Sequence, residues 1–314
     1  MNMQKIIIPE AADAQTNHYL AQKGYDVIKV ANPSKADLLA HPDVAGAMVY
    51  LSPMPNDLYD QLPNLKVLAR YGVGYDNIDA DYAAKKGVWV TNTPGANAVS
   101  VAEAAVTDML LLAKQSIPIA ANMKTNGWTQ KESIVGRELT GATVGIIGFG
   151  DIGQTVAKLL TGFGCRILIY NRTHRDTPYG TYVDLETLLT ESDFVSIHIA
   201  AVPATEHLID AQALKLMKKS AYLVNMARGA IVDEQALYDA LKQHDIAGAG
   251  LDVFEHEPLP KDDPLMSLDN AYLTPHSAAI THEAGYNMAM GASKMIDAVL
   301  SGQTPEWAVN QPVK

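Results

Sequence analysis

Several features are scarce or missing in the sequence. It contains one cysteine, Cys165, so no internal disulfide can form, and we expect a reducing compartment such as the cytoplasm. No stretch approaches the ~20 consecutive apolar residues that a membrane-spanning helix needs. The apolar run in the opening "MNMQKIIIPE" is too short for a secretion signal. The sequence therefore predicts a protein without a membrane segment.

An excess of positive charge is also missing. The chain has 24 Lys and Arg against 35 Asp and Glu, which gives a net charge of −11. Broad nucleic-acid binding needs a basic face that neutralises phosphates, so nucleic acid is not an expected partner. A small anion in a local positive pocket is still possible. Internal repeats and low-complexity tracts are absent as well.

The apolar runs that are present have α/β spacing. Short β-rich runs separated by helix-length stretches occur at Ile6–Ile8, Val27–Val30, Ala47–Tyr50, Val67–Ala69 and Val88–Val90. A second series occurs at Thr143–Ile147, Arg166–Tyr170, Phe194–Ile199, Ala221–Asn225, Ile246–Ala249 and Ala271–Leu273. With right-handed crossovers, each series forms a parallel sheet covered by helices.

Three helices complete this pattern. A long apolar helix is expected over 100–114, with Ser100 as its N-cap, another over Asp233–Lys242, and a last one over Glu283–Leu300. We expect the last helix to return to the first sheet. The predicted fold is α/β, with two doubly wound parallel-sheet (Rossmann or flavodoxin-like) lobes and a cleft between them. A substrate-binding domain comprises 1–98 and 283–314, and a dinucleotide-binding domain comprises 99–282.

A glycine loop stands between the first strand of the second series and a helix. In "TVGIIGFGDIGQTVAKLL", Gly148 allows a tight turn, Gly150 lets the backbone approach a pyrophosphate, and Gly153 lets the helix pack on the strand. The helix N-terminus offers free N–H groups to the phosphates. The alternative is a plain glycine turn, but the strand, helix and second strand arrive in the expected order. We predict dinucleotide binding.

The end of the second strand, "RILIYNRTHR", indicates which dinucleotide binds. An acid that would contact the ribose hydroxyls is expected here, and Asn171 stands in its place. Asn171 does not repel a 2′-phosphate, and Arg172 and Thr173 can bind one. NADP is therefore favoured over NAD. The alternative is that Arg172 is a solvated surface residue and NAD binds without the usual acid.

Polar residues follow three later strands. Arg228 lies in "YLVNMARGAIVD", Asp252 and Glu257 lie in "GAGLDVFEHEPL", and His276 lies in "YLTPHSAAITHE". Strands of a doubly wound sheet end at the same carboxyl edge, where ligands bind. An arginine, a carboxylate and a histidine are therefore expected beside a nicotinamide.

These motifs resemble the D-isomer-specific 2-hydroxyacid dehydrogenase family over essentially the full length. The matching stretches are "RYGVGYDNID", "NAVSVAEAAV", "ELTGATVGIIGFGDIG", "SDFVSIHIAAVPATEHLI", "VNMARGAIVDEQAL", "LDVFEHEPLP" and "LTPHSAA". The resemblance implies that Arg228 binds the carboxylate and oxo group of a 2-oxo acid, that His276 is the acid–base, and that Glu257 is its partner. It also implies that the N–H groups of Val73 and Gly74 bind the substrate carboxylate.

The expected roles agree with the chemistry. A guanidinium binds two oxygens at once, and an imidazolium donates the proton that hydride addition to a carbonyl requires. The cofactor-binding positions that we expect are Gly148, Gly150, Asp151, Ile152, Gly153, Asn171, Arg172, Thr173, Thr205, Met226, Ala227, Asp252, Ser277 and Ala278. No metal site is expected. The resemblance further implies a homodimer joined through the dinucleotide-binding domain, to which 100–114 and "NGWTQKES" contribute.

Three readings of the function remain open. The favoured one is an NADPH-dependent reductase of a small 2-oxo acid such as glyoxylate or hydroxypyruvate. The second is a D-3-phosphoglycerate dehydrogenase, which is disfavoured because "LSPMPND" carries no cation for a phosphate and Arg70 is the only basic residue nearby. The third is a dinucleotide-sensing binding protein without turnover.

Overall fold

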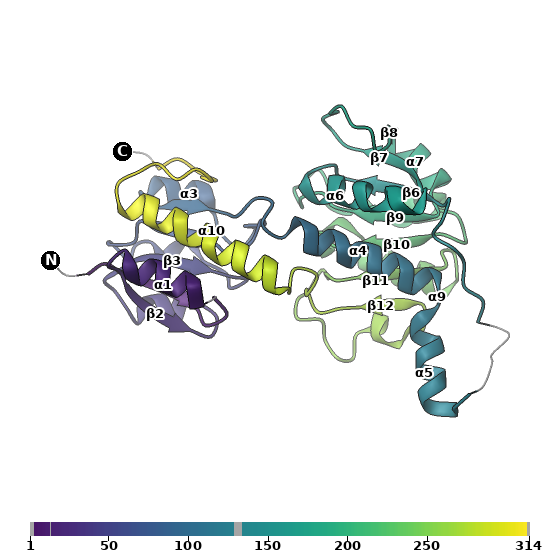
Figure 1. The fold of residues 1–314 in the computed structure, drawn as a ribbon, viewed down its shortest axis with the longest axis horizontal. Helices are drawn as coiled ribbons and strands as arrows, with labels where there is room; N and C mark the ends of the chain where they lie inside the picture. The colour runs from purple at the N-terminus through teal and green to yellow at the C-terminus, as the bar shows by residue number, and fades with distance from the viewer. Residues whose placement is uncertain (1–2, 13, 129–133, 313–314) are drawn as a thin grey trace. The chain divides into compact units, whose positions relative to one another are not determined.

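The computed structural model describes residues 3–12, 14–128 and 134–312 (Figure 1). The chain forms two compact units, one from 1–97 with 280–314 and the other from 98–279. These limits lie within three residues of the expected domain boundaries. That the units act as separate substrate and cofactor domains stays a prediction.

The first unit is built on a five-stranded parallel sheet. Its strands, in the spatial order β2-β1-β3-β4-β5, are β1 (Lys5–Pro9), β2 (Asp26–Val30), β3 (Val44–Val49), β4 (Val67–Arg70) and β5 (Trp89–Thr91). Helix α10 (His282–Leu300) packs on β3 and β4 beside α1 (Ala14–Gln22), so the last helix returns to the first sheet as expected. The short helices α2 (Lys35–Leu39), η1 (Asn56–Leu58) and α3 (Ala80–Lys85) contribute to a separate apolar cluster on this sheet.

The second unit is built on a seven-stranded parallel sheet. Its strands are β6 (Thr143–Ile147), β7 (Arg166–Tyr170), β8 (Thr181–Tyr182), β9 (Phe194–Ile197), β10 (Tyr222–Asn225), β11 (Gly248–Leu251) and β12 (Ala271–Leu273). They lie in the order β12-β11-β10-β9-β6-β7-β8, so the chain changes direction at β6, between β7 and β9. The predicted class of two parallel-sheet α/β lobes is confirmed.

Side chains of the second sheet alternate between two apolar cores. Val144, Ile146 and Val224 pack with helices α4 (Ala98–Ala113) and α6 (Asp151–Leu160), which lie side by side on one face (Figure 1). Ile147 and Leu223, each adjacent in its strand to a residue of the first core, pack with the helices of the other face. Those helices are α7 (Leu185–Glu191), α8 (Ala211–Leu216) and α9 (Glu234–Lys242). This two-residue period is what the pleat of a strand imposes.

Some expected details of the elements are wrong. Helix α4 begins at Ala98, so Ser100 is a buried residue inside the helix and not its N-cap, because Ala98 and Val99 extend the apolar helical pattern. Strand β11 lies two residues later than expected. Strand β8 was not expected at all, since two residues carry no apolar run. Among the described residues, no helix is long and apolar enough to cross a bilayer.

Candidate active site

The glycine loop joins β6 to α6 at the point where the strand order changes direction. Gly148 has φ +96°, a conformation that side chains rarely adopt, and a Cβ there would lie 2.6 Å from the carbonyl carbon of His198. A Cβ at Gly153 would lie 2.1 Å from the Gly148 oxygen, so the helix requires glycine to pack this closely. Gly150, the N-cap of α6, has open space where its Cβ would stand. A phosphate group therefore fits against this helix N-terminus.

Asn171, at the end of β7, ties the glycine loop to the next loop. Its Oδ1 accepts the Phe149 N–H at 3.0 Å, and its Nδ2 donates to the Thr173 oxygen at 2.5 Å. Sequence reasoning placed Asn171 on the ribose but did not foresee this bracing role. Arg172 and Arg175 are exposed, and neither pairs with a carboxylate among the described residues.

The loop after β7 is also held by Tyr182 of β8. The His174 imidazole stacks on the Tyr182 ring, with 4.2 Å between centroids and 17° between planes. The Tyr182 hydroxyl accepts the Arg175 N–H at 3.0 Å, and the ring meets the edge of Phe149 at 5.9 Å. The two arginines therefore project from a preformed loop.

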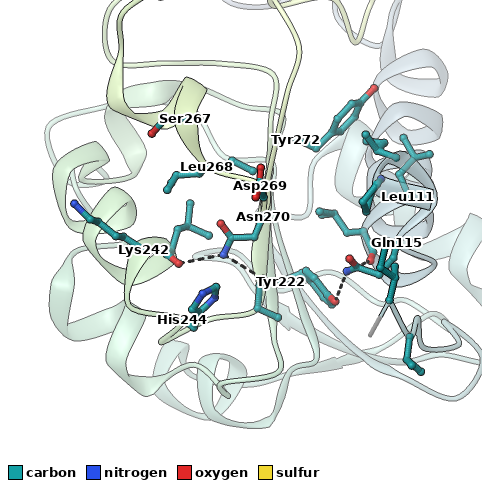
Figure 2. Close-up of a pocket in the computed structure, with 18 residues that line it drawn as sticks. Leu111, Gln115, Tyr222, Lys242, His244, Ser267, Leu268, Asp269, Asn270 and Tyr272 are labelled. Carbon is teal, nitrogen blue, oxygen red and sulfur yellow. Dashed lines mark hydrogen bonds between the residues drawn. The ribbon is translucent and has the colours of Figure 1, made fainter. Parts of the chain in front are cut away.

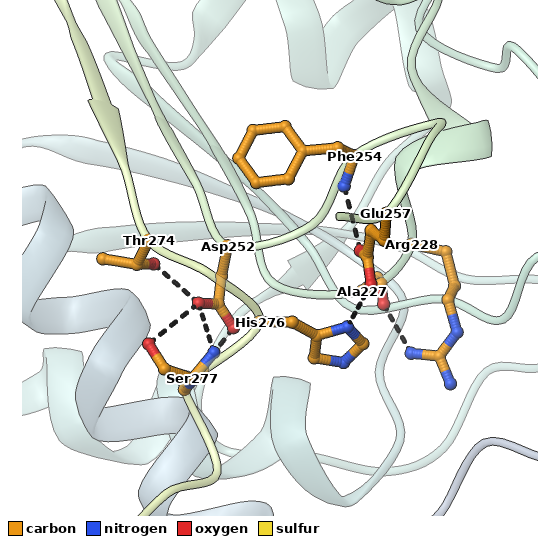
Figure 3. Close-up of polar contacts among 9 residues, drawn as sticks. Ala227, Arg228, Asp252, Phe254, Glu257, Thr274, His276 and Ser277 are labelled. Atoms are coloured by element: carbon orange, nitrogen blue, oxygen red, sulfur yellow. Dashed lines mark hydrogen bonds and ion pairs between the residues drawn. The ribbon is translucent and has the colours of Figure 1, made fainter. Parts of the chain in front are cut away.

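The arginine, glutamate and histidine expected beside the nicotinamide follow three adjacent strands. Arg228 comes after β10, Glu257 after β11 and His276 after β12. Gly229 allows the first two loops to meet, because a Cβ there would lie 1.9 Å from the backbone carbon of Phe254. The structure brings Glu257 and His276 together, with Oε2 2.7 Å from Nδ1 (Figure 3).

Glu257 is held as a carboxylate. Burial raises its pKa, but the hydrogen bond and charge of His276, the Phe254 N–H at 3.1 Å and the charge of Arg228 together hold the pKa below its usual value. Arg228 is half-buried, and its Nη1 donates to the Ala227 oxygen at 2.6 Å. The ionised Glu257 carboxylate therefore fixes the orientation of the His276 ring through their contact.

Asp252 organises the segment that carries His276. The buried carboxylate accepts the Thr274 hydroxyl at 2.6 Å and the N–H groups of Ser277 and Ala278 at 2.7 and 2.9 Å (Figure 3). The Asp252 backbone oxygen also accepts the N–H of His276, whose φ is +50°. These contacts hold the segment in place, and the expected binding of cofactor by Asp252, Ser277 and Ala278 stays a prediction.

The remaining expected cofactor residues lie along the same edge of the sheet. Asp151 and Ile152 open α6, and Met226 and Ala227 are buried directly after β10. Thr205 closes the loop after β9, where its hydroxyl donates to the Ala200 oxygen at 2.8 Å and accepts the Val202 N–H. His198 is structural: its Nε2 lies 2.8 Å from the Ser196 hydroxyl, and burial lowers its pKa to about 3.

The first unit presents its own loop after β4. Gly72 has φ +137°, and its N–H donates to the Thr93 hydroxyl at 3.2 Å, while Asn92 donates to the Val73 oxygen at 2.8 Å. Among the described residues, none accepts a hydrogen bond from the N–H groups of Val73 or Gly74. Arg70 is buried within this unit, where it donates to the Tyr71 oxygen and lies over the Tyr50 ring.

A separate pocket of about 660 Å³ lies at the opposite edge of the second sheet. It adjoins the amino ends of β10, β11 and β12, and Leu111, Tyr222 and Tyr272 are among the side chains that line it (Figure 2). Two of its polar side chains bond to other lining residues: Asn270 donates to the Leu241 oxygen at 3.1 Å, and Gln115 donates to the Tyr222 hydroxyl at 3.5 Å. This pocket is remote from the glycine loop and from His276.

Comparison with known proteins shows the family to which the chain belongs. Residues 106–278 match the model of the D-isomer specific 2-hydroxyacid dehydrogenase NAD-binding domain. The chain is 41% identical to a glyoxylate reductase of Korarchaeum cryptofilum over 90% of this chain and 88% of that one. It is 38% identical to a D-3-phosphoglycerate dehydrogenase of Methanocaldococcus jannaschii over 99% of this chain and 60% of that one.

A solved structure is similar throughout. An NADPH-dependent glyoxylate/hydroxypyruvate reductase of Sinorhizobium meliloti, in complex with NADP and malonate, superposes with a TM-score of 0.87 at 29% identity, covering 98% of this chain and 97% of that one. The chain belongs to the D-isomer specific 2-hydroxyacid dehydrogenase family, as its motifs predicted. It is an oxidoreductase that uses a nicotinamide cofactor.

Proposed function

We propose that the protein reduces a small 2-oxo acid, of the glyoxylate or hydroxypyruvate type, to the D-2-hydroxy acid with NADPH. The observation that carries this proposal is the contact between His276 and Glu257, in which a carboxylate supports an imidazole beside Arg228. The opposite direction uses the same groups, with His276 as base in place of acid.

The cofactor supplies the hydride, and residues of this chain do the rest. The α6 N-terminus at Gly150 holds the pyrophosphate, and the loop after β7 holds the adenosine end. Because His276 Nδ1 faces Glu257, Nε2 is the atom that donates a proton to the developing alkoxide. Arg228 binds the substrate carboxylate and polarises the oxo group. That the N–H groups of Val73 and Gly74 bind a substrate carboxylate stays a prediction.

The preference for NADPH is supported by Arg172 and Arg175. Both are exposed in a loop that Asn171 and Tyr182 hold in place, and no acid occupies the end of β7 to repel a phosphate. A preformed pair of guanidinium groups favours the 2′-phosphate because less side-chain ordering is needed on binding. The structure of the Sinorhizobium relative in complex with NADP supports the same preference.

A substrate without a phosphate is favoured by the environment of Arg70. Its guanidinium is buried against the Tyr71 oxygen and the Tyr50 ring, and Lys35, which also reaches the 51–57 loop, pairs with Asp57, so both of these cations are engaged within their own unit. D-3-phosphoglycerate is the second candidate because one curated relative carries that name.

We further propose a homodimer joined through the second unit. Helix α5 (Ser116–Asn126) exposes Ile117, Ile119 and Met123, each more than 40% exposed, beside the pocket of Figure 2. Exposed apolar side chains gathered on one element are typical of a surface covered by a partner. Residues 129–133 of the "NGWTQKES" segment, which was expected to contribute to the dimer interface, lie outside the described residues. A cytoplasmic location rests on the lone Cys165 and stays a prediction.

The test is a panel of 2-oxo acids assayed by loss of NADPH or NADH absorbance. Glyoxylate and hydroxypyruvate should be turned over, with NADPH the better donor. Oxidation of phosphoglycerate with higher kcat/KM would favour the second candidate. If cofactor binds but no 2-oxo acid is reduced, the protein is a dinucleotide-sensing protein and the proposal fails.

A further inference from the structure

Asp108 is a buried acid in the apolar helix α4. Its side chain is 4% exposed, and its Oδ2 has no hydrogen-bond partner among the described residues. An ionised carboxylate in such a place carries a large desolvation cost, whereas a protonated one does not. The fold of the helix does not require an acid here, because the neighbouring buried positions are alanine, valine and methionine.

The Asp108 carboxyl lies against β11 on the face that carries Asp252. A Cβ built on Gly250 would lie 2.6 Å from Asp108 Oδ2, so glycine makes room for this carboxyl group. Asp252 comes directly after β11, two residues beyond Gly250, and its charge acts on the Asp108 carboxyl group. The two acids therefore share one buried region between α4 and the end of β11.

Only one of the two acids has donors to support a charge. Asp252 accepts from Thr274, Ser277 and Ala278, whereas Asp108 Oδ2 accepts from none of the described residues. A negative charge on Asp252 is therefore stabilised by these donors, whereas a charge on Asp108 Oδ2 is stabilised by none of the described residues. Burial and then the charge of Asp252 raise the pKa of Asp108 to about 7.

Among the described residues, one further titratable group, Tyr272, interacts with both acids. Burial, followed by the charges of Asp108 and Asp252, raises the pKa of Tyr272 of β12, so this phenol stays neutral. Among the described residues, no cation is paired with Asp108. Loss of the Asp108 proton therefore places a second, uncompensated negative charge beside Asp252.

We propose that Asp108 is a positioning residue whose proton lets Asp252 hold the 274–278 segment, so that loss of this proton weakens binding of the nicotinamide cofactor. The proposal rests on the proposed function in one respect, that Asp252 and the segment carrying His276 border the nicotinamide. An ionised Asp108 repels the Asp252 carboxylate and disturbs the contacts by which that carboxylate holds Thr274, Ser277 and Ala278, on either side of His276. Cofactor affinity then falls as pH rises through neutrality.

The test compares the wild-type protein with Asp108→Asn, which keeps the shape of the protonated acid. The dissociation constants of NADPH and NADH are measured by nicotinamide fluorescence between about pH 6.5 and pH 8.5, without any 2-oxo acid. The wild-type Kd should rise about tenfold over this range, whereas that of the variant should stay within about twofold. Glu103→Gln, which removes an exposed acid from the same helix, should behave as wild type.

Equal pH dependence in the wild type and Asp108→Asn overturns the proposal. If the variant does not fold, the wild-type protein labelled with ¹³C at its aspartate carboxyls gives the answer. One resonance should titrate near neutral pH, and flat resonances from about pH 6 to pH 8.5 would also overturn it. Because both readouts omit the 2-oxo acid, a failure of turnover alone counts against the proposed function and not against this role of Asp108.

Discussion

His276 Nδ1 and Glu257 Oε2 are 2.7 Å apart, and they belong to loops that follow neighbouring strands of one sheet. The contact fixes the orientation of the imidazole and leaves Nε2 for the substrate. Asp252 supports the same imidazole from the other side, through the backbone of the segment that carries it. The proton donor is therefore held at both its ring and its main chain.

Replacement of Glu257 tests the first of these supports. Glu257→Gln should lower kcat for reduction by about 10²-fold, because the amide no longer offers the carboxylate that orients the proton-donating imidazole. The Kd of NADPH should change little. Glu255→Gln is the matched control, since Glu255 pairs with a different histidine, His207, at 2.7 Å. An equal loss of kcat in the two variants would mean that Glu257 does not support His276 in catalysis.

Cofactor choice is tested at Arg172. Arg172→Ala should raise the KM for NADPH about tenfold and leave the KM for NADH nearly unchanged, because only NADPH carries the 2′-phosphate. Arg166→Ala is the control: this arginine starts the same strand but pairs with Glu191 at 2.7 Å. A similar rise for both cofactors would remove Arg172 from phosphate recognition.

The proton on Asp108 has a consequence for stability. The pKa of Asp108 is about 7 in the folded state and about 4 in the unfolded state. Between about pH 4 and pH 7 the folded state therefore binds a proton that the unfolded state has lost. The free energy of unfolding falls as the pH rises through this range. The loss is of the order of 2–4 kcal/mol at pH 8. Asp108→Asn should therefore raise Tm at pH 8 and change it less at pH 5. A variant less stable than wild type at pH 8 would contradict this.

The apolar surface of α5 makes a prediction about assembly. Ile119→Asp with Met123→Asp should convert a dimer to a monomer in light scattering, because two charges on a covered apolar face cost more than the contact contributes. Leu216→Asp, which changes an exposed leucine on α8, should leave the dimer intact. A wild-type protein that is already monomeric would refute the proposed dimer.

Strand patterning and loop chemistry made much of this fold predictable from the sequence. The apolar runs of eleven strands were visible because parallel strands are buried on both faces. Arg228, Glu257 and His276 could be grouped because each follows a strand and carboxyl ends meet at one edge. The glycine loop was equally predictable, because each of its glycines is required by a different steric constraint.

The features that were missed depend on contacts between segments far apart in the sequence. Strand β8 has two residues and no apolar signal, yet its Tyr182 organises the loop of Arg172. Asp108 is one acid in an apolar helix. Its relation to Asp252 is visible only from the packing of α4 on Gly250. Strand β11 was misplaced because "GAGL" carries few large apolar residues, a consequence of that same close packing.

The central claim is that His276 supplies the proton in a reduction driven by NADPH. The most direct measurement is single-turnover oxidation of bound NADPH by glyoxylate in His276→Asn, with NADPH binding measured on the same sample. We predict that cofactor binding persists while the rate falls by about 10²- to 10⁴-fold. A near-normal rate would contradict the claim and assign the proton to another group.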